Sequence, residues 1–328
     1  MFRDYIEKMP IKAQYKLEIF NSLRKFKWKL KYKGEKLSSL LSNQTFVPSN
    51  SNYGHEHWLK SYSKFEHSIY ALIEHGLFFG ENESKVGFKS EWDLGSIMTY
   101  GNYRAELLHR LYPDYNIVKI GPRIHYALTD ESYLRELKGK IDSSKKSLTV
   151  FPSHSLEGEK VEYNIELFYK EIRTIALELN IKNILVSLHP SDFIHNIDRL
   201  FTERGMIVVS SGVDDIKFLP RQRAIFEVSD VTYSNSLGTH VGYSLCMNTP
   251  HIINVTSMQS RPEADSLSSI FFKEEQLISS AFNGNEPFVI TQEQKDLYDY
   301  YWGADCILPA DKLYKELTNC YKLFRNRQ

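Results

Sequence analysis

Short apolar segments alternate with longer helix-like segments through the second half of the chain, and this alternation restricts the fold more than any other sequence feature. Strands separated by helices form a parallel sheet with helices on its faces, because each parallel connection needs a crossover. The sequence therefore predicts a doubly wound α/β domain. We expect its strands at 148–151, 184–188, 206–209, 231–233 and 251–255, and its helices at 163–179, 192–204, 221–228 and 241–247.

The first half has a weaker form of the same pattern. The pattern indicates strands at 68–73, 96–100 and 116–120, helices at 12–33 and 102–111, and a Ser- and Asn-rich loop at 38–54. Residues 130–146 are polar and charged, which is typical of a linker. The length of 328 residues suits two domains, and two domains imply a cleft between them. We expect an acceptor-side domain at 1–140, a donor-binding domain at 147–290 and C-terminal helices at 291–328 that pack back on both.

Charge and cysteine content narrow the function classes. The formal net charge is zero, which gives no overall attraction to nucleic acid. Cys246, Cys306 and Cys320 are isolated, which favours free thiols in a reducing compartment. Lys and Arg interrupt every apolar stretch of residues 1–35, so the segment predicts neither a signal peptide nor a membrane span. We expect a cytoplasmic protein.

Common cofactor and metal motifs are missing from the sequence. Neither the dinucleotide fingerprint Gly-x-Gly-x-x-Gly nor a P-loop occurs, which disfavours dehydrogenases and P-loop enzymes. His55 and His57 flank Glu56, but alternate residues on a loop give no fixed geometry and a third ligand is not evident. We therefore assign no cofactor and no metal.

Residues 24–33 form a basic segment in which Lys and Arg alternate with Phe26, Trp28, Leu30 and Tyr32. Such a segment suits an anionic membrane surface, where each cation contributes about 1 kcal/mol. One interpretation is therefore peripheral attachment to the inner face of a membrane. A solvated face whose apolar side rests on its own domain explains the pattern equally well, and nucleic acid would also accept it.

Three polar turns follow predicted strands of the second domain. His189-Pro190 follows the strand at 184–188, so its imidazole should lie at the carboxyl end of the sheet, where open α/β sheets bind ligands. A histidine there can donate to a phosphate oxygen or pass a proton to it, although a turn histidine bonded to backbone is the alternative. The turns at 152–155 and 234–240 have the same form, and the second one leads into a helix start that favours anions. Helix capping alone would explain one of its hydroxyls. The predicted donor-binding residues are Ser153, His154, His189, Pro190, Ser234, Ser236, Thr239 and His240.

The first domain offers two comparable turns. Glu74, His75 and Gly76 follow a strand, and a carboxylate or imidazole there could deprotonate an acceptor hydroxyl. Arg123 lies in a turn near the expected hinge, where it could pair with a phosphate or with the carboxylate of a sugar. Ordinary surface turns are the alternative interpretation of both.

These motifs resemble those of bacterial polysaccharide glycosyltransferases of the GT-B architecture, in which two Rossmann-like domains face a cleft. Glu74-His-Gly76 looks like the acidic motif of the bacterial sialyltransferases and polysialyltransferases, His189-Pro190 like their His-Pro motif, and Ser234-Asn-Ser236 like their serine motif. The resemblance implies that the first motif supplies the base and that the other two hold the CMP phosphate. His75 stands where a second acidic residue is usual, so either Glu74 or His75 is the expected base, with His189 as the third catalytic candidate.

A second resemblance is to the CDP-glycerol glycerophosphotransferases of teichoic-type polymer synthesis. It rests on Glu74-His-Gly76, Gly121-Pro-Arg123 and Leu188-His-Pro190, and it implies that His75 and His189 are the catalytic candidates. We expect a metal-independent glycosyltransferase that moves an acidic nonulosonic or Kdo-like sugar from a CMP-activated donor to a capsule or lipopolysaccharide glycan or glycolipid. The alternatives are a CDP-glycerol or CDP-ribitol phosphotransferase and a non-catalytic nucleotide- or glycan-binding protein.

Overall fold

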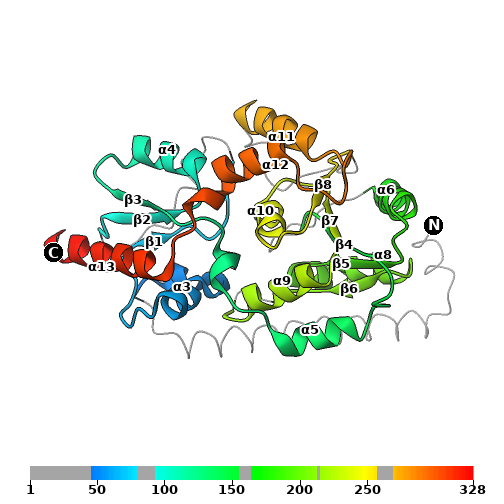
Figure 1. Ribbon diagram of the computed structural model, residues 1–328, viewed down its shortest axis with the longest axis horizontal. Helices are drawn as coiled ribbons and strands as arrows, with labels where there is room; N and C mark the ends of the chain where they lie inside the picture. The colour runs from blue at the N-terminus through cyan, green and yellow to red at the C-terminus, as the bar shows by residue number, and fades with distance from the viewer. Residues whose placement is uncertain (1–45, 80–92, 155–163, 213–214, 257–268, 328) are drawn as a thin grey trace, which may run out of the picture.

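The computed structural model describes residues 46–79, 93–154, 164–212, 215–256 and 269–327. Within these ranges the chain forms two α/β units, each built on its own parallel sheet, which lie side by side along the long axis of the molecule (Figure 1). The predicted helix at 12–33 and the basic segment at 24–33 lie outside the described residues. Among the described residues, no helix has the length and apolarity that crossing a membrane requires.

The second unit contains a five-stranded sheet in the order β6-β5-β4-β7-β8, with every neighbouring pair parallel. Its strands are β4 (Ser147–Phe151), β5 (Asn183–Ser187), β6 (Ile207–Val209), β7 (Val231–Ser234) and β8 (His251–Ile253). The chain starts in the middle, builds one side of the sheet and then the other, so the strand order reverses between β4 and β7. Loops at the carboxyl ends of these two strands diverge there and leave a crevice for a ligand. The predicted doubly wound sheet is therefore confirmed.

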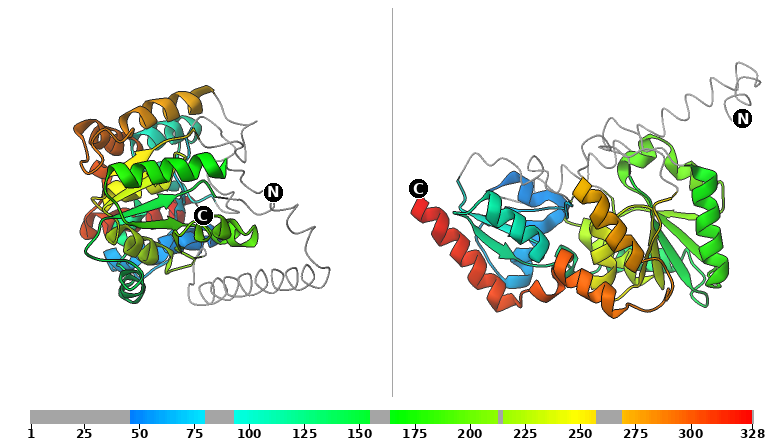
Figure 2. Two further views of the ribbon diagram at one scale, coloured as in Figure 1. Left: turned by 90° about the vertical axis from the view of Figure 1, so that its right-hand side faces the viewer. Right: turned by 90° about the horizontal axis from the view of Figure 1, so that it is seen from above.

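Helices cover both faces of this sheet (Figures 1 and 2). They are α6 (Ile165–Glu178), α7 (Pro190–Ile194), α8 (Ile197–Thr202), α9 (Phe218–Glu227) and α10 (Thr239–Cys246). The longest, α6, is capped by the Asn164 side chain and buries Phe168, Ile172 and Ala176, which recur every four residues on one face. A single helix was expected at 192–204, but Asn196 adopts a left-handed conformation with φ of 58° and splits it into α7 and α8.

The first unit has a smaller parallel sheet in the order β1-β2-β3. Its strands are β1 (Leu72–Ile73), β2 (Ser96–Thr99) and β3 (Asn116–Lys119), and its helices are α3 (His55–Ser63) and α4 (Asn102–Leu111). A 3-10 turn at Pro48–Gly54 precedes α3, and another lies at Arg123–Tyr126. Strand β1 is much shorter than expected, because residues 68–71 run into it without sheet pairing.

Two connections join the units. Residues 130–146 were expected to be a linker, but they contain α5 (Glu131–Lys138), which packs against α9. Its Tyr133 hydroxyl lies 2.9 Å from the Ser210 carbonyl oxygen, so this segment belongs physically to the second unit. The limits of 1–140, 147–290 and 291–328 remain predictions for the domains.

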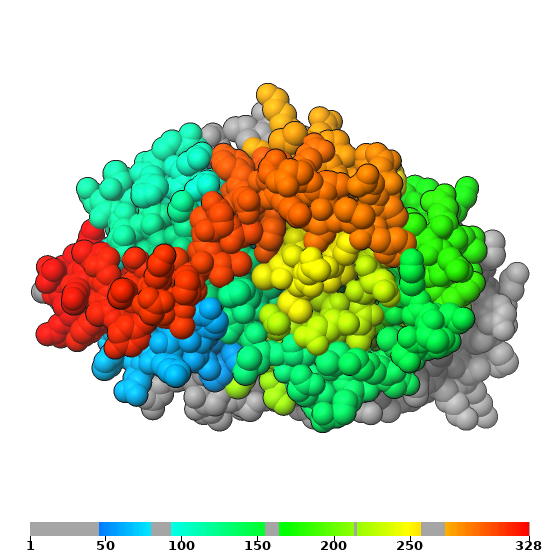
Figure 3. Space-filling view, viewed as in Figure 1, coloured from blue at the N-terminus to red at the C-terminus, as the bar shows by residue number. Residues whose placement is uncertain are grey.

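The C-terminal segment makes the return connection, and it lies across the junction of the two units in Figure 3. It comprises α11 (Ser269–Ala281), α12 (Gln292–Leu297), a π-helix at Tyr298–Trp302, a 3-10 turn at Ala304–Cys306 and α13 (Ala310–Arg327). A Cβ atom on Gly242 would lie 2.1 Å from the Trp302 ring, so this glycine lets the indole seat fully against α10. Leu313 and Leu317 of α13 then join the apolar core of the first unit.

Candidate functional site

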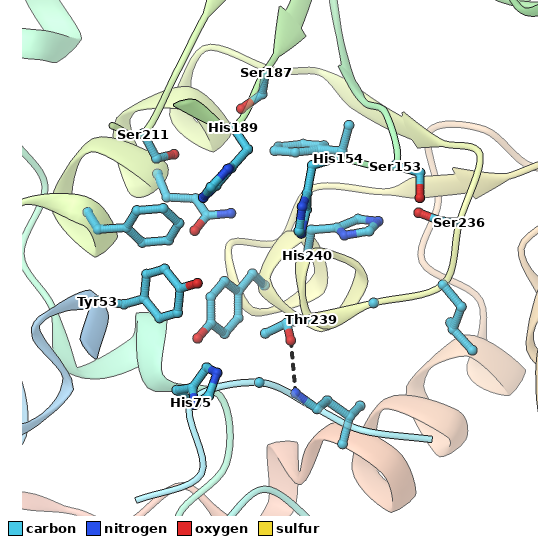
Figure 4. Close-up of a pocket in the computed structure, with 18 of the residues that line it drawn as sticks. Tyr53, His75, Ser153, His154, Ser187, His189, Ser211, Ser236, Thr239 and His240 are labelled. Carbon is cyan, nitrogen blue, oxygen red and sulfur yellow. Dashed lines mark hydrogen bonds between the residues drawn. The ribbon is translucent and has the colours of Figure 1, made fainter. Parts of the chain in front are cut away.

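A cavity of about 550 Å³ lies where the two units meet (Figure 4). The second unit contributes the loops after β4, β5, β6 and β7 together with the start of α10, and the first unit contributes the loop after β1 and the turn before α3. The cavity therefore includes the crevice at the β4 and β7 ends, where the strand order favours ligand binding. The polar and charged side chains that line it come from Tyr53, His55, His75, Ser153, His154, Ser187, His189, Ser211, Gln222, Ser236, Thr239, His240, Tyr243 and Glu275.

His189 lines the cavity at the end of β5, as predicted. The ring Nδ1 of His189 accepts from the backbone N–H of Ser191 at 3.3 Å and so caps α7. The backbone N–H of His189 donates to the Asp192 carboxylate at 3.0 Å. An imidazole whose Nδ1 accepts must carry its proton on Nε2 when neutral. Burial, and then the charge of His154, lowers the pKa of His189 to about 3. The ring therefore presents a neutral N–H donor in the absence of an anion.

Pro190 follows as the first residue of α7 and is buried rather than part of the lining. A proline at this helical position lacks an N–H that would have no partner in the helix, and its ring fixes the turn. Pro190 thus fixes the turn that carries His189 and lies outside the cavity lining, and its contact with the donor stays a prediction.

Two further histidines extend the same wall. The ring of His240 stacks on Phe151 with centroids 5.6 Å apart, and burial followed by the charge of His154 lowers its pKa to about 4. Its Nε2 atom is buried without a hydrogen-bond partner among the described residues. His154 lies between His189 and His240, with its ring centroid 5.0 Å from that of His189. Figure 4 shows His154, His189 and His240 gathered on one side of the cavity.

The serine turn after β7 divides into two parts. Ser236 and Thr239 line the cavity, whereas Ser234 is fully buried. The Ser234 hydroxyl donates to the Ser236 carbonyl oxygen at 2.8 Å and lies 2.9 Å from Nε2 of His251. Ser234 therefore bonds within the loop and does not line the cavity, and its contact with the donor stays a prediction.

Thr239 joins the two units at the cavity. Its Oγ1 accepts from the backbone N–H of Leu77 at 2.9 Å, the bond drawn in Figure 4. Thr239 is also the first residue of α10, so the positive end of that helix lies in the same region. The interaction brings the loop after β1 against the predicted phosphate-binding turn.

Glu74 does not reach the cavity. Its side chain is buried, with one oxygen 2.5 Å from Nη2 of Arg104 and the other accepting from the Thr99 hydroxyl at 2.5 Å. A carboxylate whose two oxygens are bonded to a buried cation and a hydroxyl, outside the cavity lining, is poorly placed to take a proton from a substrate. Of the two base candidates, the geometry therefore disfavours Glu74.

Arg123 is also buried instead of lining the cavity. Its guanidinium donates to the carbonyl oxygens of Gly121 at 2.7 Å, Glu74 at 3.0 Å and Met98 at 3.2 Å, and it stacks 3.8 Å above the Tyr100 ring centroid. These bonds tie strand β2, which contains Met98, to the segments that follow β1 and β3. Arg123 thus has a structural role from a buried position, and its contact with a phosphate or a sugar carboxylate stays a prediction.

The first unit lines the cavity with His75, Tyr53 and His55. Glu74 directly follows β1, and His75 is the next residue. The ring centroid of His75 lies 5.9 Å from that of Tyr53. Tyr53 has a left-handed backbone with φ of 55°, which is uncommon for an aromatic residue and often marks a functional turn. Figure 4 shows Tyr53 and His75 on the side of the cavity opposite His189. The two walls thus place imidazoles across a shared space.

Several lining residues were missed from sequence: Tyr53, His55, Ser187, Ser211, Gln222, Tyr243 and Glu275. Ser187 and Ser211 had an available signal, since each lies at or just beyond the end of a strand. Tyr53 and His55 were inside or beside a segment interpreted as loop, and His55 was considered only as a metal ligand. Among the described residues, no group of three or more His, Cys, Asp and Glu side chains is arranged to hold a metal ion.

Comparisons with known proteins give only distant similarity. No protein-family model and no curated protein matches the chain. A solved structure of the wall teichoic acid polymerase TagF shares 14% identity over 71% of this chain and 59% of its own, with a TM-score of 0.42. The UDP-GlcNAc 2-epimerase from Neisseria meningitidis shares 16% identity over 59% of this chain and 57% of its own, with a TM-score of 0.32. The UDP-GlcNAc 2-epimerase from Methanocaldococcus jannaschii shares 15% identity over 66% of this chain and 58% of its own, with a TM-score of 0.35. The chain thus spans less than two thirds of these structures, and similarity at this level does not identify a function.

Proposed function

We propose that this protein is a GT-B-type transferase that moves a group from a cytidine-nucleotide donor to a hydroxyl of a cell-surface polymer. The observation that carries the proposal is the placement of His75 and His189 on opposite walls of one cavity at the strand-order reversal. In this proposal the donor phosphate lies against His189, Ser236 and the start of α10. The acceptor then approaches from the side of His75.

The favoured donor is a CDP-linked polyol such as CDP-glycerol or CDP-ribitol. The resemblance to the CDP-glycerol glycerophosphotransferases requires the two histidines, and both line the cavity. The resemblance to the sialyltransferases makes the acidic motif the source of the base, but Glu74 is buried against Arg104. Arg123, the expected partner of a sugar carboxylate, is buried as well.

The reaction would be a displacement at phosphorus. The acceptor oxygen forms a bond to the phosphorus that carries the polyol, and the bond from that phosphorus to the oxygen of CMP breaks. The acceptor proton passes to His75, and the Nε2–H of His189 donates to the departing CMP phosphate as its negative charge increases. Phosphate binding would favour protonation of His189, because an adjacent anion stabilises imidazolium.

Transfer of an acidic sugar from a CMP donor is the second candidate. It is supported by the presence of His189 and Ser236, the lining members of the His-Pro and serine motifs, in the same cavity. In that case His75 in place of Glu74 would deprotonate the acceptor.

Attachment of residues 24–33 to an anionic membrane, and a cytoplasmic location, remain predictions.

Thermal unfolding with added nucleotides tests the proposal. CMP, CDP and CDP-glycerol should raise the melting temperature more than UMP or UDP, since a ligand at 100 times its dissociation constant adds about 2.7 kcal/mol of stability. Release of CMP from CDP-glycerol and from CMP-sialic acid, measured with a glycan or polyol acceptor, then separates the two donors. If none of the cytidine compounds stabilises the protein, both candidates are wrong.

A matched pair of variants locates the nucleotide. His189→Ala should lose most of the CMP-induced shift, because a hydrogen bond to a charged group contributes about 1.5–3 kcal/mol. His195→Ala is the control, since His195 ends α7 and is absent from the cavity lining. Equal CMP shifts in the two variants would place the phosphate elsewhere.

A further inference from the structure

His55 is held at the cavity wall by a rigid turn. Tyr53 and Gly54 are both left-handed, with φ of 55° and 74°, and they reverse the chain just before α3. A Cβ atom on Gly54 would lie 2.8 Å from the Cα atom of Ile216, and the Trp58 indole donates to the Ile216 carbonyl oxygen at 2.8 Å. The turn is thus pressed against the second unit, and His55 has little freedom to move away from the cavity.

The side chain of His55 is buried without the hydrogen bonds that burial normally requires. The residue is 1% exposed, lines the cavity, and neither ring nitrogen has a hydrogen-bond partner among the described residues. His251, at 2% exposed, provides a contrast, since its nitrogens lie 2.7 Å from Thr232 and 2.9 Å from Ser234. Buried polar groups are nearly always paired, so a pair of unpartnered nitrogens at a cavity points to a ligand.

The charge state of His55 restricts that ligand. Burial lowers its pKa well below the usual value, and the nearby charges of Arg123 and His75 act in the same direction. A neutral imidazole offers one N–H donor and one acceptor nitrogen. A hydroxyl can satisfy either nitrogen, whereas an ionised carboxylate or phosphate oxygen can accept only from the N–H and leaves the acceptor nitrogen unpaired. The site therefore suits neutral, hydroxyl-rich groups.

We infer that His55 is a specificity residue that binds a hydroxyl of a neutral polyol or sugar acceptor, next to the hydroxyl that reacts at His75. This inference rests on the proposed transferase function. The Tyr53 ring, which lies 5.9 Å from the His55 ring and 4.5 Å from that of Phe218, adds an apolar face for the carbon atoms of such an acceptor. His55 thus acts on acceptor choice and His75 acts on the proton.

Binding can be tested without turnover by NMR of protein labelled with 15N-histidine. The His55 signals are assigned by their loss in His55→Phe, and ribitol, glucose and glycerol 3-phosphate are titrated with and without CMP. We expect ribitol or glucose to shift both His55 ring signals. A response to glycerol 3-phosphate alone, or no response to any of the three, overturns the inference. Failure of the proposed function has a different signature, the absence of stabilisation by every cytidine compound.

Kinetics of matched variants provide the second test. His55→Phe should raise the KM for the acceptor by about tenfold with a smaller change in kcat, since it removes hydrogen bonds to a neutral group. His55→Gln, which keeps a donor and an acceptor, should recover part of that loss. His57→Phe is the control on the same helix, because His57 is absent from the lining. The ligand-free melting temperature should not fall in His55→Phe, where no protein hydrogen bond is lost. A lower melting temperature with an unchanged KM would make His55 a structural residue and overturn the inference.

Discussion

The two walls of the cavity are built by different means. The second-unit wall consists of strand ends of a regular five-stranded sheet, so Ser153, His189 and Ser236 converge because parallel strands end at one edge. The first-unit wall has one strand end, which carries His75, and a strained turn that carries Tyr53 and His55. The proposed donor side thus follows from sheet topology. The proposed acceptor side depends on local backbone conformations, those of Tyr53 and Gly54.

The largest expected effect separates the chemical roles of the two walls. His75→Gln should lower kcat by about 10²- to 10⁴-fold, the usual contribution of a general base, and leave the CMP-induced thermal shift unchanged. Steady-state release of CMP and thermal unfolding measure the two quantities. The exposed His67, changed to Gln, is the control. Loss of CMP binding together with activity would place His75 on the donor side and remove the division between the walls.

A second prediction concerns the carboxylate behind the first-unit wall. Glu74→Ala leaves Arg104 buried without its ion partner, so the free energy of unfolding should fall by about 3–5 kcal/mol. Urea denaturation measures this change, and Glu136→Ala is a matched control because the Glu136–Lys140 pair is exposed. A variant that keeps its stability but loses kcat would instead identify Glu74 as the base.

These residues show how far the sequence could lead. Strand positions and strand ends are periodic features, and they were enough to predict the doubly wound sheet and the cavity-lining His154, His189, Ser236, Thr239 and His240. The sequence pattern could not show which of two adjacent residues faces the cavity. Glu74 and His75 are adjacent, yet one is buried against Arg104 and the other faces the cavity.

Two of the assigned residues, Ser234 and Arg123, are buried outside the cavity lining, because they bond to protein groups that the sequence pattern does not reveal. Ser234 was assigned to the phosphate, but its hydroxyl donates to the Ser236 carbonyl oxygen and lies beside Nε2 of His251. Arg123 was assigned to substrate, but its buried guanidinium donates to the carbonyl oxygens of Gly121, Glu74 and Met98. Tyr53 and His55 were missed because the sequence does not indicate the left-handed backbone of Tyr53 and Gly54. That turn places both side chains at the cavity.

The smallest expected effect concerns the donor wall and pH. Burial lowers the pKa of His189 in the folded protein to about 3, against an ordinary value of 6.5, so between these pH values the unfolded chain binds a proton that the folded protein does not. The stability contributed by the neutral ring is complete above pH 6.5 and is lost as the pH falls toward 3. This residue alone should reduce the free energy of unfolding by about 1 kcal/mol between pH 7.5 and 5.5.

Urea denaturation at the two pH values measures this loss, and His189→Asn should lack it while Asn still caps α7. Changing the exposed His109 to Asn is the control. Saturating CMP should also diminish the loss in the unaltered protein, because a bound phosphate stabilises protonated His189 and raises its folded pKa. A pH dependence that CMP leaves unchanged would mean that the phosphate does not contact this ring, and the second-unit wall would then need another donor-binding residue in its place.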